Sequence, residues 1–484
     1  MKLDAECSYQ ALVSRDARFD GRFFVGVSST GIYCRPICRV RRPKQENCTF
    51  YESAAAAEGS GFRPCLRCRP ELAPGQSPME ASAQLAQRMA LALQSDDDDD
   101  AGVARLGARF GVSERHARRV FGAEFGVSPV EFLQTHRLLT AKRLLTDTTM
   151  PIAEVAGASG FASLRRFNAL FHDRYRLKPS DLRKGHKAKN SEAGFRFCLP
   201  FRPPYDARQM LEFLGLRAIS GMEACDGETY RRTVALTQKG QRFVGWFSAR
   251  FGTSAALEIV VSPSLGPVLP AVLARIAHLF DLDGQPTDVS ACLGPLAEAH
   301  PGLRVPGVMD GFEIAVRAVL GQQVTVKAAR TLAMRVLETF GEPITTPFED
   351  LRWTFPSAER LAAVLPEELG ALGILRTRSA TIKALARAVA TKELRLEPGV
   401  DVDSTLQALL RLPGIGEWTA NYIALRALAW PDAFLATDHG VHAALPGLST
   451  AQIHARAEAW RPWRGYAVMQ LWASLDTTEA PIPK

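Results

Sequence analysis

The sequence predicts a multidomain α+β protein, and three observations lead to this fold class. With 484 residues, the chain is long enough for about three domains of roughly 100 to 200 residues each. Its 46% hydrophobic and 23% charged residues are typical of globular domains with real cores. Two polar stretches, residues 71–82 and 183–194, indicate linkers. We expect a small cysteine-rich α/β domain, an all-α domain with two helix-turn-helix units, a mixed α/β subdomain and an all-α helix-hairpin-helix domain.

We place these four parts at residues 1–75, 83–183, 195–304 and 305–484. Charge separates the first two from the rest, because residues 1–190 contain 30 Lys+Arg and 21 Asp+Glu, whereas residues 191–484 contain 29 and 30. A local basic excess favours contact with nucleic acid. The chain has no run of about 18 apolar residues, and its first residues lack the apolar stretch of a signal peptide, so we expect a cytoplasmic protein without a membrane partner.

The first part contains two close cysteine pairs, Cys34-x3-Cys38 and Cys65-x2-Cys68, separated by 26 residues. Four thiolates at this spacing suit tetrahedral Zn2+, because each pair can span one edge of the tetrahedron. The total of 9 cysteines is odd, which argues against a disulfide framework. Spacing alone leaves open whether the metal only holds the fold, as in a zinc ribbon, or takes part in chemistry.

The segment FFVGVSSTGIYCRPICRVRRPKQENCTFYESAAAAEGSGFRPCLRCRP resembles the N-terminal domain of the bacterial adaptive-response regulator Ada. In that family, the zinc-bound thiolate matching the first cysteine of TGIYCRPIC takes a methyl group from a methyl phosphotriester in DNA. The resemblance therefore implies that Cys34 is the methyl acceptor and that each chain binds one Zn2+. It also implies a bacterial, nucleoid-associated protein with RNA polymerase as a further partner.

Elementary charge considerations agree with this chemistry. Zinc keeps a thiolate deprotonated at neutral pH, and the thiolate is the nucleophilic form of cysteine. Four thiolates on one Zn2+ leave a net negative charge, which repels DNA phosphates until nearby arginines offset it. Seven arginines are interleaved with the cysteines: Arg35, Arg39, Arg41, Arg42, Arg63, Arg67 and Arg69. Because methylation of one sulfur removes one negative charge, we expect it to strengthen DNA binding and to convert damage into a regulatory signal.

The strongest basic excess lies in the predicted helical part. The segment AGVARLGARFGVSERHARRVFGAEFGVSP has apolar helical spacing, a turn at Gly111 and a cap at Ser113 before a second helix. That helix carries basic side chains suited to DNA: Arg115, His116, Arg118 and Arg119. A single pattern of this kind is weak evidence, since short helix pairs are common in all-α proteins.

A second unit follows in MPIAEVAGASGFASLRRFNALFHDRYRLKP, where Pro151 opens a helix, the chain turns near Gly160 and another helix begins at about Ser163. That second helix exposes three polar side chains: Arg165, Arg166 and Asn168. Two units joined by EFLQTHRLLTAKRLLTDT resemble the AraC-type DNA-binding domain, which also follows the zinc domain in Ada regulators. Arginines of such helices contact guanine edges and phosphates of promoter DNA.

The C-terminal part lacks the Pro-Cys-His-Arg motif of the methyltransferase that ends a full-length Ada regulator. It contains LRLPGIGEWTANYIALRAL instead, which reads as a helix-hairpin-helix with Gly414 and Gly416 in its turn. Such glycines let the backbone approach DNA, and the N–H groups that begin the second helix can bind a phosphate. Carbonyl groups of the turn could also hold a monovalent cation. Because non-enzymatic DNA-binding proteins share this hairpin, it does not by itself indicate an enzyme. The pattern becomes more specific because an acidic residue, Asp438, follows 22 positions after Gly416.

Hairpin and aspartate together resemble the helix-hairpin-helix DNA glycosylases. Segments from PPYDARQMLEFLGLRAIS through PGLRVPGVMDGFEIAVRAVLGQQVTV to AWRPWRGYAVMQLW are similar to 3-methyladenine DNA glycosylase II (AlkA). Trp418 stands where glycosylases with lyase activity have a nucleophilic lysine, which implies a monofunctional enzyme. By the resemblance, Asp438 stabilises the oxocarbenium-like sugar and helps to place the attacking water. The implied base pocket consists of four aromatic residues: Trp418, Tyr422, Trp472 and Phe213.

Two positions depart from the AlkA pattern. Gln322 begins the GQ motif, and Gln323 stands where relatives have a leucine that wedges into the duplex. Thr437 replaces an acidic neighbour of Asp438. We expect both glutamines and both hairpin glycines to contact double-stranded DNA that carries methylated phosphates or alkylated bases.

Two other classes of function remain compatible with the residues. In the first, the chain is a damage-responsive regulator whose C-terminal half binds but does not excise damaged bases. In the second, it is a zinc-stabilised architectural protein without chemistry, since single aromatic residues at helical spacing usually belong to a core. A glycosylase releases 3-methyladenine from methylated DNA, whereas a regulator that only binds damage does not. Gain of a methyl group on Cys34 would exclude the architectural protein.

Overall fold

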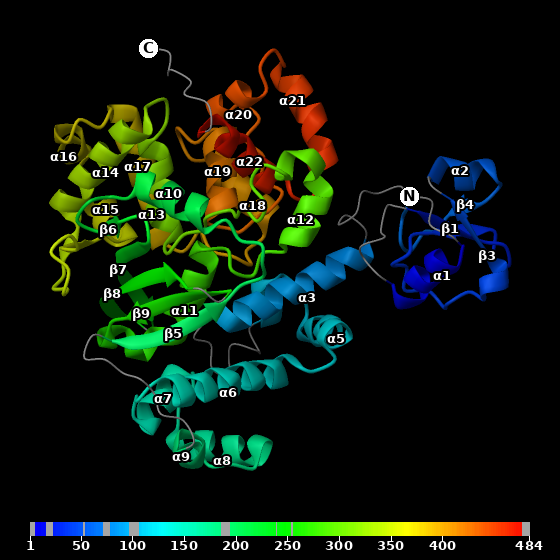
Figure 1. Ribbon diagram of the computed structural model, residues 1–484, viewed down its shortest axis with the longest axis horizontal. Helices are drawn as coiled ribbons and strands as arrows, with labels where there is room; N and C mark the ends of the chain where they lie inside the picture. The colour runs from blue at the N-terminus through cyan, green and yellow to red at the C-terminus, as the bar shows by residue number, and fades with distance from the viewer. Residues whose placement is uncertain are drawn as a thin grey trace. The chain divides into compact units, whose positions relative to one another are not determined.

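The computed structural model describes residues 5–15, 23–51, 54–70, 78–95, 106–184, 194–238, 240–252 and 255–476 (Figure 1). Over these residues the chain forms two compact units: the first extends to Leu133, apart from Ser95, and the second contains Ser95 and the residues from Gln134 onwards. The main division therefore lies within helix α6 (Pro129–Asp147). Most of both predicted linkers, residues 71–77 and 185–193, lies outside the described residues.

The first unit begins with a four-stranded sheet of order β3-β1-β2-β4. Its strands are β1 (Phe24–Val27), β2 (Ile32–Cys34), β3 (Cys48–Tyr51) and β4 (Arg63–Pro64). Strand β1 is antiparallel to β2 and β3, whereas β4 runs parallel to β2. Three short helical segments accompany the sheet: α1 (Ala5–Ser14), η2 (Gln45–Asn47) and α2 (Ala54–Gly59).

The helical part of the first unit contains α3 (Pro78–Ser95), α5 (Glu114–Phe125) and the start of α6. Helix α3 begins at Pro78, so the first predicted linker overlaps its initial turn. Met89, Leu93 and Phe121 are buried between these helices. Gly111 has φ +67°, in the left-handed region that favours glycine, which confirms the predicted turn.

The second helix-turn-helix consists of α7 (Ile152–Ala158) and α8 (Leu164–Tyr175), followed by α9 (Pro179–Lys184). Pro151 is the residue that precedes α7, and Gly160 turns the chain with φ +82°. Phe167 and Phe171 are fully buried. They belong to the same hydrophobic cluster as the sheet that follows in the chain.

That sheet has five strands in the order β5-β9-β8-β7-β6, and each neighbouring pair is antiparallel. The strands are β5 (Phe195–Pro200), β6 (Glu223–Cys225), β7 (Thr229–Gln238), β8 (Gln241–Phe251) and β9 (Ala256–Val261). The predicted runs RFVGWF and ALEIVVSP form β8 and β9. The helical segments are α10 (Ala207–Arg217), η3 (Pro263–Val268), α11 (Leu269–Leu279), α12 (Pro286–Leu293) and η4 (Gly294–Ala297).

The C-terminal part is mainly helical, as predicted, and the colours of its helices in Figure 1 run from green at α13 to red at α22. The helices are α13 (Gly311–Leu320), α14 (Val326–Phe340), α15 (Ala358–Ala363), α16 (Pro366–Ala371), α17 (Arg376–Ala390), α18 (Val402–Leu410), α19 (Glu417–Arg426), α20 (His439–Ala444), α21 (Thr450–Ala457), η5 (Glu458–Trp460) and α22 (Arg464–Asp476). Two two-residue strands, β10 (Glu342–Pro343) and β11 (Trp353–Thr354), pair antiparallel and depart from the all-α expectation. Within the described residues, no helix has the length and apolar character needed to cross a bilayer.

A buried ionic network joins the five-stranded sheet to α13. Arg232 of β7 contacts Glu223 of β6 at 3.2 Å and Glu313 of α13 at 2.6 Å. Arg317 of α13 contacts both glutamates at 2.9 Å, and the Tyr230 hydroxyl donates to Glu223 at 2.6 Å. Two positive and two negative charges therefore alternate in an interior that would penalise any one of them left unpaired.

Candidate functional site

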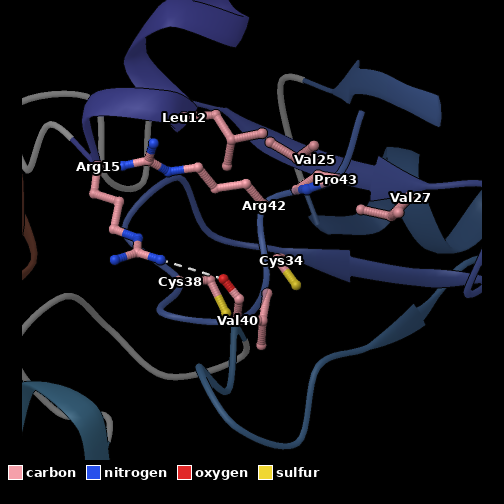
Figure 2. Close-up of a pocket in the computed structure, with 9 residues that line it drawn as sticks. All are labelled: Leu12, Arg15, Val25, Val27, Cys34, Cys38, Val40, Arg42 and Pro43. Atoms are coloured by element: carbon pink, nitrogen blue, oxygen red, sulfur yellow. Dashed lines mark hydrogen bonds between the residues drawn. The ribbon is translucent and has the colours of Figure 1, made fainter. Parts of the chain in front are cut away.

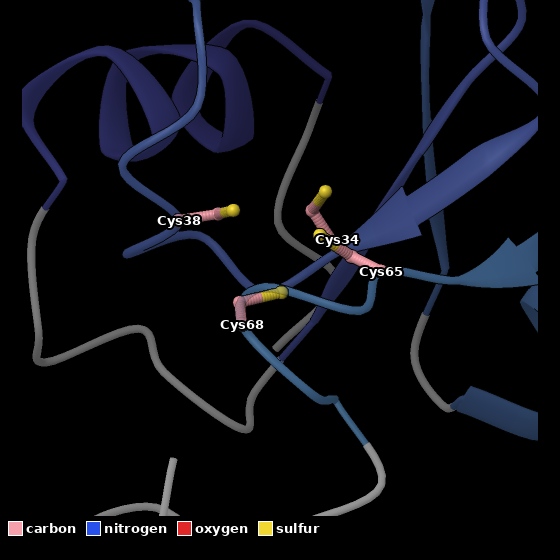
Figure 3. A group of neighbouring side chains, drawn as sticks. All are labelled: Cys34, Cys38, Cys65 and Cys68. Atoms are coloured by element: carbon pink, nitrogen blue, oxygen red, sulfur yellow. The ribbon is translucent and has the colours of Figure 1, made fainter. Parts of the chain in front are cut away.

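The four predicted zinc ligands lie together in the first unit (Figure 3). The Sγ atoms of Cys34, Cys38, Cys65 and Cys68 all lie within 4.8 Å of one another, and all four residues are buried. Parallel pairing of β2 with β4 accounts for this, because the backbone N–H of Cys65 donates to the carbonyl of Tyr33 at 3.1 Å. Cys34 is the last residue of β2 and Cys65 directly follows β4, so the pairing of these strands brings the two cysteine pairs together.

The chemistry of this donor set fits a divalent cation. Hydrogen bonds with Cys38 and then Cys68 raise the pKa of the Cys34 thiol far above its usual value. The hydrogen bond from Cys34 lowers the pKa of Cys38 to about 3. Without a cation, the four neighbouring sulfurs therefore retain protons that they share by hydrogen bonding. Zn2+ can replace these protons, because it binds four thiolates in tetrahedral geometry with Zn–S distances of about 2.3 Å.

A small cavity opens beside Cys34 and Cys38 and is shown in Figure 2. Its walls include the aliphatic side chains of Leu12, Val25, Val27 and Val40, and the side chains of Arg15 and Arg42 also line it. The guanidinium of Arg15 donates to the carbonyl of Val40 at 3.2 Å. Aliphatic side chains and two cationic side chains therefore adjoin the first cysteine pair.

Six of the seven arginines around the cysteines are exposed, as a surface for phosphate requires. Arg35 differs, because its side chain is only 1% exposed. Its backbone N–H donates to Cys68 Sγ at 3.5 Å, so this residue belongs to the support of the cluster. The sequence pattern gave no signal that would distinguish Arg35 from its neighbours.

The predicted recognition helices have the expected caps and exposed faces. Ser113 accepts from the N–H of His116 at 3.2 Å, and Ser163 accepts from the N–H of Arg166 at 3.4 Å. His116 is half-buried, with Nδ1 3.2 Å from a guanidinium nitrogen of Arg119. The remaining predicted DNA-contacting side chains of both helices are exposed: Arg115, Arg118, Arg119, Arg165, Arg166 and Asn168.

The predicted hairpin connects α18 to α19. Gly414 has φ +80°, and a Cβ there would lie 2.1 Å from Oγ1 of Thr381. Gly416 is the N-cap of α19, and a Cβ there would meet nothing within 4 Å. The first glycine is therefore required by the fold, whereas the second leaves open space in front of the first N–H groups of α19.

The two predicted glutamines face different surroundings. The side-chain amide of Gln322 donates to the carbonyl of Gly414 and to Oγ1 of Thr419, both at 2.9 Å, so it braces the hairpin from within. Gln323 is exposed and has φ +52°. A non-glycine residue in this left-handed conformation stores backbone strain, which is frequent at functional positions.

Asp438 is the N-cap of α20, where its Oδ1 accepts from the N–H of Val441 at 3.1 Å. Both predicted pocket indoles also donate to this carboxylate: Trp472 Nε1 to Oδ1 at 2.8 Å and Trp418 Nε1 to Oδ2 at 2.9 Å. Together the three N–H donors fix the orientation of the carboxylate. Thr437 beside it is exposed.

Each of these two indoles is paired with a second aromatic ring, and we call Phe213, Trp418, Tyr422 and Trp472 the aromatic cluster. Trp418 and Tyr422 stack with ring centroids 5.3 Å apart, and Phe213 and Trp472 are nearly parallel, with 15° between their planes and centroids 6.3 Å apart. Phe213 comes from α10, Trp418 and Tyr422 from α19, and Trp472 from α22. The structure thus brings together all four predicted pocket residues, although they are separated by up to 259 positions in the chain.

Two arginines of this site were missed by the sequence reasoning. Arg217 and Arg426 each lie four positions after an aromatic residue of the cluster on the same helix, which places them on the same helical face. The guanidinium of Arg217 is 3.7 Å from the ring centroid of Phe213, and that of Arg426 is 5.7 Å from that of Tyr422. The four-residue spacing is the signal that could have found them.

Four family models match successive segments of the chain. The metal binding domain of Ada matches residues 7–71, and a helix-turn-helix domain matches residues 106–185. The AlkA N-terminal domain matches residues 196–310, and the HhH-GPD superfamily of base excision DNA repair proteins matches residues 316–461. A protein of Mycobacterium tuberculosis named "Probable bifunctional transcriptional activator/DNA repair enzyme AlkA" is 37% identical over 496 aligned positions, which cover 98% of this chain and 97% of that protein.

The chain belongs to this family of bifunctional activator and repair proteins. The DNA-3-methyladenine glycosylase 2 of Escherichia coli is 39% identical over 277 positions, covering 57% of this chain and 96% of that protein. A 3-methyladenine DNA glycosylase from Archaeoglobus fulgidus shares the fold, with a TM-score of 0.50 and 19% identity over 58% of this chain and 99% of that chain. As a family member, the chain combines an Ada-type zinc domain, a DNA-binding helix-turn-helix domain and a DNA glycosylase domain.

Proposed function

We propose that the C-terminal half excises alkylated bases such as 3-methyladenine by hydrolysis, with Asp438 as the catalytic residue. The observation that carries this proposal is the carboxylate held by Trp418 and Trp472 inside the aromatic cluster. A carboxylate suits a sugar that becomes cationic as the glycosidic bond breaks. The carboxylate can also orient the attacking water.

The aromatic cluster suits an extruded alkylated purine. Enzymes that act on a base take it out of the stack and read it between aromatic side chains. Phe213 and Trp472 present nearly parallel rings, with 15° between their planes, and such faces suit stacking with a flat base. Because Trp418 occupies the lysine position of lyases, the proposed enzyme is monofunctional.

The decisive experiment measures release of 3-methyladenine from methylated DNA by wild type and by Asp438→Asn. We expect release by wild type and at least a hundredfold lower rate for the variant, while its affinity for DNA with an abasic site is retained. If wild type releases no base, the C-terminal half binds damage without excising it, and the regulator alternative holds.

We propose further that Cys34 accepts a methyl group from methyl phosphotriesters. The Cys34 sulfur forms a bond to the methyl carbon, the bond from that carbon to the phosphate oxygen breaks, and the electron pair remains on the phosphodiester. Bound Zn2+ supplies the charge that keeps the four sulfurs deprotonated. The aliphatic cavity beside Cys34 and the neighbouring Arg15 and Arg42 support this assignment.

Mass spectrometry after incubation with methylated DNA tests the acceptor. We expect one added methyl group on the peptide that contains Cys34, and none in the Cys34→Ser protein, whereas Cys48→Ser is a control that keeps the methyl gain. A methyl group on Cys38 instead would refute the assignment. Affinity of methylated and unmethylated protein for one promoter at matched salt tests whether the loss of negative charge strengthens DNA binding.

We propose that methylated protein activates transcription by binding a promoter through the exposed arginines of α5 and α8 and by recruiting RNA polymerase. Their caps and exposed faces support promoter contact. In a transcription assay with purified polymerase, Arg165→Ala is expected to lower activation without changing base excision. Activation that is independent of this residue would argue against promoter contact by α8.

A monovalent cation at the hairpin is the remaining proposal. The carbonyl of Gly414 accepts from Gln322, and that of Leu412 accepts from the N–H of Ile415 at 3.2 Å. Each carbonyl oxygen has a second lone pair, which can face a cation and a DNA phosphate. We expect DNA affinity to be higher in potassium chloride than in tetramethylammonium chloride at equal ionic strength, and equal affinities would exclude the cation.

A further inference from the structure

The hydroxyl group of Tyr422 is held by a buried arginine. Arg426, one turn further along α19, donates from Nη1 to this oxygen at 2.8 Å. Arg426 is 4% exposed, and the backbone fixes its guanidinium, because Nε donates to the carbonyl of Pro306 and Nη2 to that of Gly307 at 3.1 Å. The fold therefore sets the position of the Tyr422 oxygen.

The backbone of Arg426 is fixed as well. Nε2 of His278 lies 3.0 Å from its carbonyl oxygen, and because a carbonyl only accepts, this nitrogen carries the imidazole proton. Burial lowers the pKa of His278 to about 4, so the ring is neutral near neutral pH. Gly307 packs directly against this histidine, since a Cβ there would lie 2.3 Å from the carbonyl oxygen of His278. Both ends of Arg426 are thus held in place.

The direction of the bond between Arg426 and Tyr422 follows from their chemistry. A guanidinium group has only donors, so the Tyr422 oxygen must accept. The hydroxyl hydrogen is then available to another partner, and in the described part of the chain this hydroxyl has no further hydrogen-bond partner. A donor without an acceptor is unfavourable in a partly desolvated site. Because Tyr422 is only half-buried, a molecule that enters the aromatic cluster can supply the acceptor.

The hydroxyl belongs to the site of the proposed chemistry. Tyr422 stacks on Trp418 with 10° between the ring planes, and Trp418 Nε1 donates to the carboxylate of Asp438 at 2.9 Å. The guanidinium carbon of Arg426 is 5.0 Å from the ring centroid of Phe213, so the same arginine adjoins both ring pairs of the aromatic cluster. A base that enters the cluster therefore comes within reach of the Tyr422 hydroxyl.

The charges around Tyr422 strengthen this donor. Burial raises the pKa of the phenol, but the positive charges of Arg426, Arg217 and Arg317, together with the hydrogen bond from Arg426, outweigh it and hold the pKa below its usual value. A hydroxyl whose oxygen accepts from a cation is polarised and donates more strongly.

We infer that the Tyr422 hydroxyl donates a hydrogen bond to the damaged base and stabilises it as the leaving group. 3-Methyladenine keeps the lone pairs of N1 and N7, and 7-methylguanine keeps those of N3 and O6, so both bases offer an acceptor. As the bond from sugar to base breaks, its electron pair stays on the base, and the acceptor atoms become more electron-rich. The hydrogen bond is therefore stronger in the transition state than in the bound substrate. The inference rests on the proposed base excision.

No proton leaves Tyr422 in this step. The oxygen of water forms a bond to the sugar carbon as the bond from that carbon to the base breaks. A base that was cationic leaves as a neutral molecule, and the water releases one proton to solvent. A base that was neutral takes up that proton. Tyr422 keeps its hydrogen and is unchanged when the base departs.

Removal of the hydroxyl is the first test, and the measured quantity is the single-turnover rate of release of 3-methyladenine and 7-methylguanine from duplex DNA. Tyr422→Phe keeps the ring that stacks on Trp418. We expect both rates to fall about tenfold, which corresponds to the loss of one hydrogen bond in the transition state. Affinity for duplex DNA with an abasic site should change less than about threefold, because no base enters the aromatic cluster.

Tyr205→Phe is the matched control, since it also removes the hydroxyl of a half-buried tyrosine. The hydroxyl of Tyr205 donates to the carbonyl of Phe280 at 2.6 Å, so its acceptor belongs to the fold. We expect both rates to stay within about twofold of wild type in this variant.

Tyr422→3-fluorotyrosine separates donation to the base from support of Arg426. Fluorine lowers the pKa of the phenol, which makes the hydroxyl a stronger donor and a weaker acceptor. At about pH 6 the phenol keeps its proton, and we expect both rates to rise about two- to threefold. If the hydroxyl only accepted from Arg426, the same substitution would leave the rates unchanged or lower them.

Three outcomes would overturn the inference: unchanged rates in Tyr422→Phe, an equal loss in Tyr205→Phe, or no rise in Tyr422→3-fluorotyrosine. A loss of affinity for abasic DNA as large as the loss of rate would also overturn it, because the hydroxyl would then act in DNA binding. If wild type releases neither base, base excision itself is refuted. If wild type releases both bases and the rates do not respond to the hydroxyl, only the role of Tyr422 as a donor is refuted.

Discussion

Alanine substitution separates the roles of the two hairpin glycines. Gly414 has φ +80°, and its substituent would lie 2.1 Å from Oγ1 of Thr381. A left-handed backbone costs a non-glycine residue about 1 to 2 kcal/mol. If Thr381 rotates away, it gives up its hydrogen bond to the carbonyl of Thr377 at 3.0 Å, which contributes about 1 kcal/mol. We therefore expect Gly414→Ala to lower the free energy of unfolding by about 2 to 3 kcal/mol.

Gly416→Ala is the matched control. Its φ is −97°, and the added Cβ would meet no atom within 4 Å, so only the weaker N-cap preference of alanine lowers stability, by about 1 kcal/mol or less. The Cβ would nevertheless stand in front of the first N–H groups of α19, where a phosphate would bind. We expect its DNA affinity to fall about tenfold while the fold is retained.

Urea unfolding and titration with fluorescent duplex DNA measure the two effects. The double substitution Gly414→Ala with Thr381→Ala should relieve the clash and, relative to Thr381→Ala alone, leave only the backbone cost of about 1 to 2 kcal/mol. If Gly414→Ala unfolds at the same urea concentration as wild type, neither the positive φ nor the close approach to Thr381 makes glycine necessary at this position. If Gly416→Ala binds DNA as tightly as wild type, the phosphate does not approach α19 at its N-cap.

Three further predictions concern pH, the hairpin and the metal. Burial raises the pKa of Asp281 to about 6 and lowers that of His278 to about 4. The ordinary pKa values, which apply to the unfolded chain, are 3.8 for Asp and 6.5 for His. Asp281 therefore makes stability fall as the pH rises from about 4 to 6, because the folded chain keeps a proton that the unfolded chain has lost. His278 makes stability rise between about pH 4 and 6.5, because there only the unfolded chain binds the proton. Asp281→Asn should therefore show stability rising by about 3 kcal/mol between pH 4 and 6.5 in urea unfolding, whereas a flat profile would contradict the two pKa shifts. Gln322→Ala removes two hydrogen bonds of 2.9 Å to the hairpin and should lower the unfolding free energy by about 1 to 2 kcal/mol, while the exposed Gln323→Ala leaves it unchanged; equal effects would show that Gln322 does not brace the hairpin. Chelation of Zn2+ should raise amide hydrogen exchange in β1, β2, β3 and β4 and leave β5 to β9 protected, and unchanged exchange in the first four strands would show that the metal does not support their fold.

The sequence was sufficient where local patterns determine structure. Ser113 and Ser163 cap their helices because a serine before an apolar-periodic segment satisfies free N–H groups. Gly111 and Gly160 mark turns because they adopt positive φ. The cysteine spacing predicted a cluster that the parallel pairing of two strands then assembles.

The sequence was insufficient where distant segments meet. Phe213 precedes Trp472 by 259 positions, and only the resemblance to AlkA placed both in one pocket. The roles of Gln322 inside the hairpin and of Arg35 under the cysteine cluster depend on packing that neither periodicity nor spacing encodes. Arg217 shares a helical face with Phe213, but only the tertiary structure brings Phe213 of α10 to Trp472 of α22, with ring centroids 6.3 Å apart.

The buried ionic network between the sheet and α13 indicates that the mixed α/β subdomain and the helical domain evolve together as one block. Arg232 contributes from β7, Glu223 from β6, and Glu313 and Arg317 from α13. Separation of the sheet subdomain from the helical domain would break the two contacts that cross between them, Arg232–Glu313 and Arg317–Glu223, while Arg232–Glu223 would stay on the sheet and Arg317–Glu313 on α13. Recombination that joins this sheet to an unrelated α13 would therefore lose two of the four contacts, whereas exchange of the whole block from residue 195 onwards would keep all four.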